Sequence, residues 1–170
     1  SWRGGEQQIA YLIEQLEKTG IQPLVACKPG SKFEAFCARK KWEHYPLRMK
    51  SSSDLKSGLG LKRLCKKLSV DIIHAHSSHS HSAAFLAFLS GNKTPVALTR
   101  RVDFELKNNF FSRYKYTFPS IGRIACVSDA INEIVVRGTG QPEKCITVYS
   151  AIDHRKFEPY VGGDFLRKEY

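Results

Sequence analysis

Residues 70–99 read VDIIHAHSSHSHSAAFLAFLSGNKTPVALT, and this stretch decides the fold class. It begins and ends with short apolar runs, residues 70–74 and 95–99, which predict buried strands. Between them, residues 80–89 are largely apolar and are followed by Gly91, which predicts a helix that ends at a glycine. A strand, a helix and a second strand in this order are typical of the βαβ unit of a parallel sheet.

The same alternation continues on both sides of this unit. Apolar runs predict further strands at residues 23–27, 123–127 and 145–149, with a weaker one at 44–47. Amphipathic spacing and end signals predict helices at residues 5–18, 54–68, 110–118 and 129–137, and another that begins at the capping box of Ser31 and Glu34. Strands therefore recur roughly every 25 residues with helices between them. This predicts a single α/β domain whose mostly parallel sheet is covered by helices on both faces.

The first residues depart from this pattern. Folds of this class open on a strand, whereas here a glycine-rich turn and a helix come first. We therefore expect a strand before Ser1 and interpret the chain as part of a longer protein.

Basic side chains are concentrated in two blocks of a chain of 170 residues with a formal net charge of +11. Residues 28–67 contain 12 basic and 3 acidic side chains, and residues 100–123 contain 6 and 2. This argues against an acidic or neutral binding surface on this chain and leaves nucleic acid, an anionic membrane or a phosphorylated small molecule as partner classes.

Several classes of protein are excluded. The longest apolar run, residues 83–89, is far below the ~18–20 residues needed to cross a bilayer. The five cysteines form no CxxC pair, so neither a disulfide framework nor a structural zinc site is indicated, and we expect a reduced, cytoplasmic protein. The sequence also lacks H-E-x-x-H, G-x-S-x-G, a Walker loop and a full G-x-G-x-x-G, which argues against metalloprotease, hydrolase, phosphoryl-transfer and dinucleotide chemistry.

Polar residues follow the predicted strands, at the edge where ligands bind in open α/β sheets. Gly4, Gly5 and Glu6 begin the first helix, where glycines let backbone amides approach an anion; an ordinary helix start is the alternative. The run of residues 74–81 holds four histidines, so a zinc site is conceivable. The alternative is a Ser/His loop in which His76, beside Ser77, donates to a ligand.

Two other strand ends carry candidate residues. Arg100 and Arg101 are suited to clamping a phosphate or carboxylate, unless they are solvated or paired with acids. Ser128 is an N-cap for the helix at residues 129–137, which Gly138 follows, and it is also a candidate ligand contact.

Five motifs in order carry a family resemblance: Gly-Gly-Glu at residues 4–6, DIIHAH at 71–76, Thr-x-basic at 99–101, IACVSDAI at 124–131 and ITVYSAID-x3-F at 146–157. The chain resembles the N-terminal domain of a family-4 (group 1) glycosyltransferase with the GT-B fold. The resemblance implies a three-layer Rossmann-like domain over residues 1–153, with residues 154–170 starting the interdomain linker. It further implies a retaining transfer from a nucleotide-sugar to a saccharide or lipid-linked acceptor, with no cofactor and no metal. The sequence contains no E-x7-E motif followed by a second set of βα units, as the donor domain would have, so that domain is expected to lie outside this chain.

The same resemblance assigns roles by position. Gly4 and Gly5 match the glycine loop near the donor phosphates and the acceptor, and His76 and Ser128 match polar residues at the cleft. Residues Ser150, Ala151, Ile152 and Asp153 match the interdomain hinge. Many relatives have a histidine where this chain has Arg101. Because arginine stays protonated, we expect an electrostatic role there, and no catalytic residue is assigned.

The larger basic block suggests a membrane contact. Lys62-Arg63 and Lys66-Lys67 lie one helical turn apart beside Leu59, Leu64 and Leu68, a pattern suited to an anionic lipid surface and equally to a solvated helix face. The resemblance adds an expected place in cell-envelope polysaccharide or lipopolysaccharide synthesis on the inner face of the cell membrane. A binding module for single-stranded nucleic acid is the alternative function, because aromatic and basic residues interleave over residues 104–118.

Overall fold

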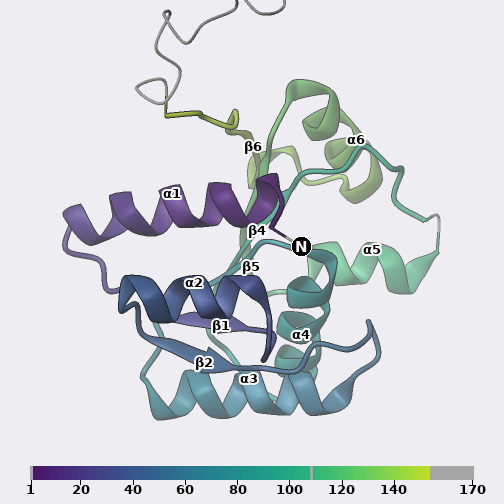
Figure 1. Cartoon of the computed structure of the whole chain (residues 1–170). Coiled ribbons are helices and arrows are strands. Elements are labelled where there is room, and N and C mark those ends of the chain that lie inside the picture. The colour runs from purple at the N-terminus through teal and green to yellow at the C-terminus, as the bar shows by residue number, and fades with distance from the viewer. Residues whose placement is uncertain (1, 108, 154–170) are drawn as a thin grey trace, which may run out of the picture.

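The computed structural model describes residues 2–107 and 109–153 (Figure 1). The helices are α1 (Gly4–Lys18), α2 (Lys32–Lys40), α3 (Leu55–Lys67), α4 (Ser78–Leu89), α5 (Phe110–Thr117) and α6 (Asp129–Thr139), with a short 3-10 helix at Pro142–Lys144. The strands are β1 (Val25–Cys27), β2 (His44–Pro46), β3 (Ile73–Ala75), β4 (Val96–Arg100), β5 (Ile121–Cys126) and β6 (Cys145–Thr147). The alternation of strands and helices is therefore confirmed.

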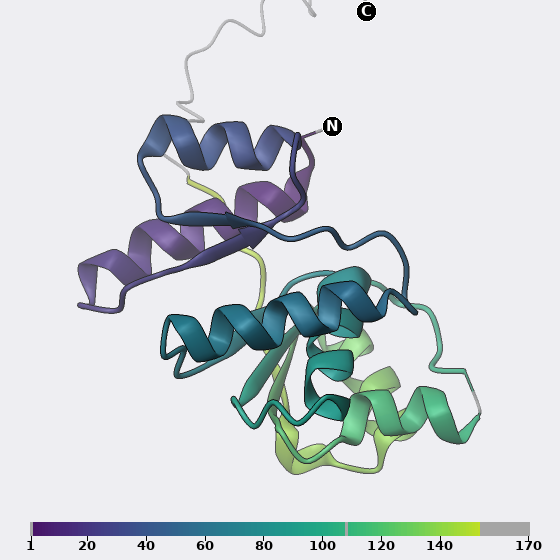
Figure 2. The same ribbon diagram turned by 90° about the horizontal axis from the view of Figure 1, so that it is seen from below.

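Every strand pair in the described part of the chain is parallel, as predicted, but the strands form two sheets. One contains β1 and β2; the other contains β3, β4, β5 and β6 in sequence order. Figure 2 shows α1, α2, β1 and β2 as one group and the elements from α3 to β6 as another. Over residues 2–107 and 109–153, β1 and β3 each pair with a single strand. The extra strand expected before Ser1 stays a prediction.

The strands are buried on alternating residues, whereas the apolar run at residues 23–27 predicted burial on both faces. In β4, Val96, Leu98 and Arg100 are buried while Ala97 and Thr99 are only half-buried. The reason is the period of two along a strand, which places successive side chains on opposite faces. The more deeply buried face of the larger sheet packs against helices, and the other face presents His74 and Thr99 at the end of the sheet.

Two hydrophobic cores match the two groups. The larger core joins α3 and α4 to β3, β4, β5 and α6, and its most deeply buried large side chains include Phe118, Ile121 and Ile124. The smaller core lies between α1, α2 and the β1–β2 pair, where Trp42 and Cys37 are buried. All five cysteines are free and buried, so they act as small apolar side chains. None of the described helices is long and apolar enough to cross a membrane.

Helices α3 and α4 approach each other closely at a glycine. A Cβ atom on Gly58 would lie 2.5 Å from the Cβ of Leu86 and 2.8 Å from its carbonyl carbon. Glycine weakens a helix by about 1 kcal/mol relative to alanine. Here it is required because a larger residue would push the two helices apart.

His81 is a buried histidine of α4 and is held by α5. Its Nε2 lies 2.7 Å from the backbone carbonyl of Lys115, and its ring meets that of Tyr116 edge-on. Burial first, and then the positive charges of Lys115 and Arg100, lower the pKa of His81 to about 3, although the hydrogen bond to Lys115 opposes this. The ring is therefore neutral at pH 7, and its Nε2–H donates to the carbonyl.

We expect His81 to make the fold sensitive to mild acid. Below pH 6.5 the unfolded chain binds a proton that the folded ring does not bind until about pH 3, so stability falls as the pH falls through this window. The contribution of His81 between pH 7 and pH 5.5 is about 1 kcal/mol. His81→Gln, which keeps a donor, should reduce this loss in urea denaturation at the two pH values. An unchanged difference between them would contradict the prediction.

Candidate functional site

The candidate site lies where β3 and β4 end side by side, and we call Glu6, His74, His76, Thr99 and Arg101 the strand-end cluster. Because β3 and β4 are parallel and adjacent, their carboxyl ends lie at the same edge of the sheet. His74 Nε2 lies 2.8 Å from the hydroxyl of Thr99. The rings of His74 and His76 are 3.9 Å apart between centroids. The adjacent strand ends thus bring together three polar side chains from two separate motifs.

Arg101 is fixed against the segment that follows β3. Its Nη1 donates to the backbone carbonyl of His76 at 2.9 Å, and its Nη2 lies 3.4 Å from Nδ1 of the same histidine. The Nε of Arg101 is buried and has no hydrogen-bond partner in the described part of the protein. A guanidinium that is held in a fixed position is suited to attracting an anionic ligand by its charge.

The first turn of α1 contributes the acidic member of the cluster. Glu6 accepts a hydrogen bond from the backbone N–H of Arg3 at 3.0 Å, and its charge favours the protonated form of Arg101. This attraction opposes the effect of burial, which lowers the pKa of Arg101. Gly4 and Gly5 are the first residues of α1, and a Cβ atom on either would meet no atom within 4 Å. Glycine there leaves open space beside the helix N-terminus instead of relieving a clash.

Both histidines of the cluster have a depressed pKa. Burial first, and then the charges of His74 and Arg101, lower the pKa of His76 to about 3. Loss of contact with water, followed by the charge of Arg101, also lowers the pKa of His74. His76 is therefore neutral at pH 7 and a weak base. It is suited to forming hydrogen bonds with a ligand and poorly suited to taking up a proton.

The two consecutive arginines have different surroundings. Arg100 is buried, with 8% of its surface exposed, and donates to the hydroxyl of Tyr116 at 2.6 Å and to the carbonyl of Phe104. Its guanidinium also lies over the ring of Tyr116, 5.4 Å from the ring centre, and this contact ties the end of β4 to α5. Since neighbouring residues of a strand point to opposite faces, Arg101 reaches the strand-end cluster and Arg100 does not.

The two candidate serines act as helix caps. Ser77 Oγ accepts from the N–H of Ser80 at 3.2 Å and begins α4. Ser128 Oγ accepts from the N–H of Ile131 at 3.3 Å and begins α6, which confirms the predicted cap. The ligand contacts expected of Ser77 and Ser128 stay predictions.

The predicted hinge passes close to α1. Gln8 Nε2 donates to the backbone carbonyl of Ala151 at 2.6 Å, while the side chains of Ser150 and Ile152 are exposed. Just before this segment, the hydroxyl of Tyr149 donates to the carboxylate of Asp129 at the start of α6. Figure 1 shows the segment leaving β6 and passing beside α1. The hinge prediction itself is not tested by these contacts.

The four histidines predicted as a metal alternative do not converge. His81 is buried against α5, whereas His74 and His76 belong to the strand-end cluster. In the part of the chain that the structure describes, no three His, Cys, Asp or Glu side chains form a group suited to a metal ion.

The aromatic and basic residues proposed for nucleic acid do not form a continuous surface. Phe104, Phe110 and Phe111 are exposed, but Phe118 is fully buried and Lys115 turns inward, where its Nζ donates to Ser82 Oγ at 2.7 Å. Consecutive bases would therefore meet an interrupted row of rings.

Two residues with notable contacts could not be recognised as such from the sequence pattern. Thr99 appeared only as part of a motif, although its hydroxyl contacts His74. Trp2 was not singled out, although it is one of only two tryptophans in the sequence and tryptophan is enriched at interfaces. It packs against the rings of α2.

Comparisons with known proteins identify the fold and the family of the chain. The model of "Glycosyltransferase Family 4" matches residues 2–156. A glycosyltransferase from Rickettsia africae ESF-5 shares 17% identity at a TM-score of 0.74, over 96% of this chain and 44% of that one. Anabaena Alr3699/HepE in complex with UDP-glucose shares 13% identity at a TM-score of 0.70, over 99% of this chain and 46% of that one. Acinetobacter baumannii MurG shares 13% identity at a TM-score of 0.60, over 92% of this chain and 44% of that one.

The chain thus spans less than half the length of these structures. No curated protein matched the sequence. The structures share the fold at low identity, and the family model covers most of the chain. The chain belongs to Glycosyltransferase Family 4.

Proposed function

We propose that this chain forms the acceptor side of a retaining glycosyltransferase that transfers a sugar from a nucleotide-sugar to a saccharide or lipid-linked acceptor. The observation that carries the proposal is the strand-end cluster, in which Arg101 is held against His76 beside the N-terminus of α1. The Anabaena structures in this fold contain UDP or UDP-glucose. We extend the proposal to acceptors of cell-envelope polysaccharide or lipopolysaccharide synthesis.

The cluster supplies binding and electrostatic stabilisation. Arg101 offers a positive charge in a fixed position, which would stabilise negative charge on a phosphate or on an acceptor oxygen. His76 is neutral and orients a ligand by hydrogen bonding. The space beside Gly4 and Gly5 admits a ligand to the backbone amides of α1, whose dipole favours an anion. No side chain of the cluster is assigned as the nucleophile or the base.

The test of the proposal is sugar transfer itself. The protein that carries this chain is incubated with radiolabelled UDP- and GDP-sugars and a panel of saccharide and lipid-linked acceptors, and the product is analysed by NMR. We expect a product that keeps the anomeric configuration of the donor, and little or no transfer by residues 1–170 alone. An inverted product would overturn the retaining mechanism, and the absence of transfer across the panel would overturn the function.

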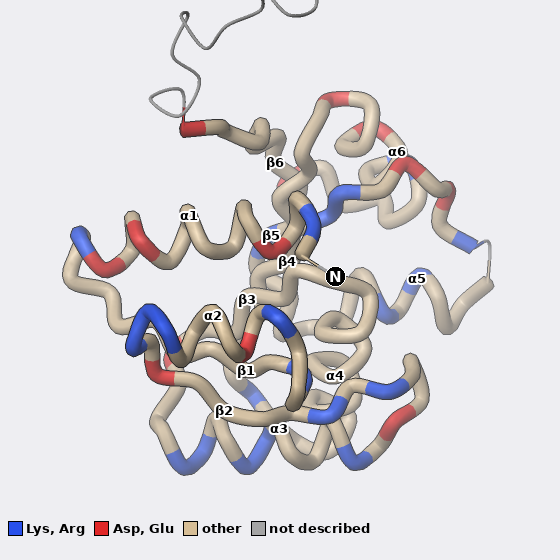
Figure 3. The backbone as a smooth tube through the Cα atoms, in the orientation of Figure 1, with Lys and Arg blue, Asp and Glu red and all other residues tan. Residues whose placement is uncertain are grey.

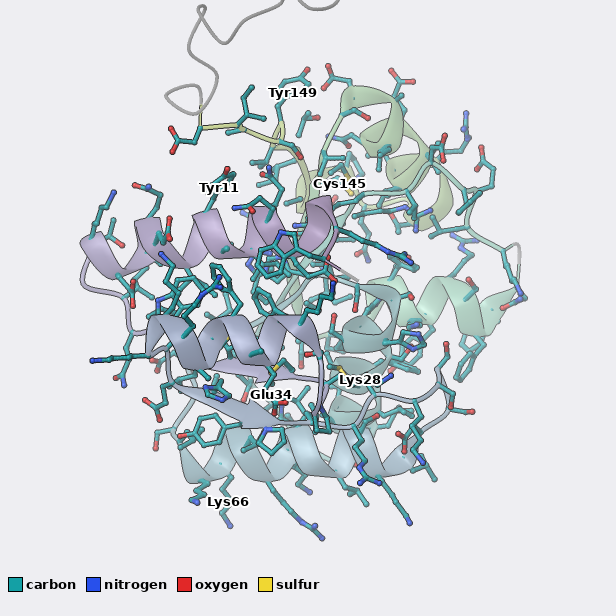
Figure 4. All side chains as sticks on the ribbon, viewed as in Figure 1. Tyr11, Lys28, Glu34, Lys66, Cys145 and Tyr149 are labelled. Atoms are coloured by element: carbon teal, nitrogen blue, oxygen red, sulfur yellow. The ribbon has the colours of Figure 1, made fainter. Side chains whose placement is uncertain are left out.

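Helix α3 supports a second part of the proposal, contact with an anionic membrane on the cytoplasmic side. Its outer face combines Leu55 and Leu59, which are 65% and 42% exposed, with the exposed Lys56, Arg63 and Lys66. Figure 3 shows the basic residues following one another along α3, and Figure 4 shows Lys66 pointing away from the protein.

The membrane-facing residues differ partly from those predicted. Leu64 and Leu68 are half-buried, and Lys62 donates to the carbonyl of Ser90, so none of the three belongs to the free face. A helix face that combines exposed leucines with basic residues is suited to binding at the boundary between lipid headgroups and acyl chains.

We expect the chain to sediment with vesicles that contain phosphatidylglycerol and not with vesicles of phosphatidylcholine alone. Each basic residue near such a surface contributes about 1 kcal/mol, so Arg63→Gln with Lys66→Gln should weaken binding roughly tenfold or more. Lys18→Gln with Arg123→Gln removes the same charge from other exposed positions and should have little effect. Equal sedimentation with both kinds of vesicle would contradict the proposal.

A further inference from the structure

A hollow of about 420 Å³ lies between the start of α1 and α2. It is lined by Trp2, Gln7, Lys32, Ala35, Phe36 and Arg39. Its size falls within the range of about 300–1,000 Å³ that small-molecule sites occupy. None of these residues belongs to the cluster on which the proposed function depends.

Aromatic rings form one wall of the hollow. The ring of Trp2 lies 4.7 Å from that of Phe36 and 6.0 Å from that of Phe33, measured between centroids. Its Nε1 donates to Oε1 of Gln7 at 3.2 Å, which fixes the indole against α1. Trp2 remains half-buried, so the wall is not sealed inside the smaller core. A preorganised aromatic wall offers apolar area to a ligand at a low entropic cost.

The α2 side of the hollow also carries basic side chains. Lys32 and Arg39 are exposed and both come from α2, and the guanidinium of Arg39 lies 5.0 Å from the centre of the Phe36 ring. The ion pairs found over residues 2–107 and 109–153 are Lys40–Glu14 and Arg137–Glu105, so neither Lys32 nor Arg39 is paired with a carboxylate there. The hollow therefore presents two cations to a ligand, and none of the residues that line it is acidic.

The hollow and the strand-end cluster share the first turn of α1. Gln7 lines the hollow, and the preceding residue, Glu6, faces Arg101. Gly4 and Gly5 leave open space at the same helix start. A ligand that extends from one site would therefore reach the other around this turn.

We propose that the hollow binds a sugar unit that carries a carboxylate or phosphate, as a remote part of the acceptor. The apolar C–H face of the sugar ring packs on Trp2, the amide of Gln7 meets its hydroxyls, and Lys32 and Arg39 hold the anionic group. The assignment of this sugar to the acceptor rests on the proposed function. The chemistry of the hollow rests on its own lining.

The two indole groups of the chain provide the test. Trp2 lines the hollow and Trp42 is buried with 8% exposure, so in ¹H–¹⁵N spectra of the chain the Trp42 indole signal serves as an internal reference. The chain is titrated separately with methyl glucuronide, glucose 6-phosphate, methyl glucoside and inorganic phosphate. We expect one or both charged sugars to shift the Trp2 signal and to shift the Trp42 signal much less, since Trp42 packs against Phe36 but does not line the hollow. The effects of the neutral sugar and of phosphate alone should be much weaker.

Variants separate the two walls. Trp2→Ala, and separately Lys32→Gln with Arg39→Gln, should each weaken binding of the charged sugar at least tenfold, about 1.4 kcal/mol. The second variant keeps the test valid if Trp2→Ala disturbs the smaller core. Lys18→Gln with Arg123→Gln is the matched control and should bind normally.

Several results would overturn the inference: equal binding of methyl glucoside, equal binding of bare phosphate, or unchanged affinity in the Lys32 and Arg39 variant. The transfer assay tests the proposed function independently of sugar binding in the hollow. Sugar transfer without binding of a charged sugar overturns only the assignment of the hollow. Binding at Trp2 in a protein that transfers no sugar supports a charged-sugar site in the hollow and contradicts the proposed function.

Discussion

Replacing Gly58 with alanine is expected to lower the free energy of unfolding by about 2–3 kcal/mol. The added Cβ would lie 2.5 Å from Leu86 Cβ and within 3.0 Å of two backbone atoms of α4. Backbone atoms cannot turn aside as a flexible side chain does, so α3 and α4 must separate. This loss exceeds the gain of about 1 kcal/mol that alanine brings to a helix. Urea denaturation at pH 7 measures the difference.

Gly60 is the matched control, because it lies in the same helix two residues further on. A Cβ there would meet only the end of the Leu47 side chain, at 2.9 Å. That side chain can shift, so Gly60→Ala should change stability by no more than about 1 kcal/mol. If Gly58→Ala were as stable as Gly60→Ala, the helix contact would not depend on the missing side chain.

Replacing Arg101 with glutamine is expected to lower the kcat of sugar transfer about 100- to 1,000-fold in the transfer assay described above. Glutamine is uncharged and cannot provide the guanidinium that is fixed against His76 at 2.9 Å. The effect should appear in kcat more than in KM if Arg101 stabilises charge that develops during the reaction, and mainly in KM if it only binds the acceptor.

Arg101→Lys and Arg123→Gln complete the experiment. Lysine keeps the charge and loses the fork of donors, so its activity should lie between that of the wild type and that of Arg101→Gln. Arg123 is exposed, and its side chain donates a hydrogen bond to the carbonyl of the neighbouring Gly122. The Arg123→Gln variant should therefore transfer sugar normally. An unchanged kcat and KM in Arg101→Gln would remove Arg101 from the proposed site.

Local signals explain which elements could be predicted. The Ser31 cap is confirmed, since its hydroxyl accepts from the N–H of Glu34 at 3.1 Å. The carboxylate of Glu34, however, accepts from Gly30 and not from Ser31 as in a standard capping box. The helix predicted to end before Gly138 continues to Thr139 and ends at Gly140, where φ is +70°. Gly138 packs inside it against Leu106, from a distant segment, which no local signal reveals.

The candidate site divides in the same way. That polar residues gather at strand ends follows from the order of strands and helices, because parallel strands end at one edge. The different surroundings of Arg100 and Arg101, and the unpaired Nε of each, depend on which face of β4 is covered. The hollow at Trp2 joins two helices whose sequences are separated by β1.

The sequence by itself determined the alternation of strands and helices, the parallel pairing and the family, since these depend on periodicity, caps and motif order along the chain. The tertiary structure alone decided the division into two sheets and two cores, and the neutrality of His76 and His81. It also decided which basic residues lie free on the surface. The physical reason is that burial, desolvation and close contact arise between segments far apart in the chain, and the sequence pattern carries no record of those distances.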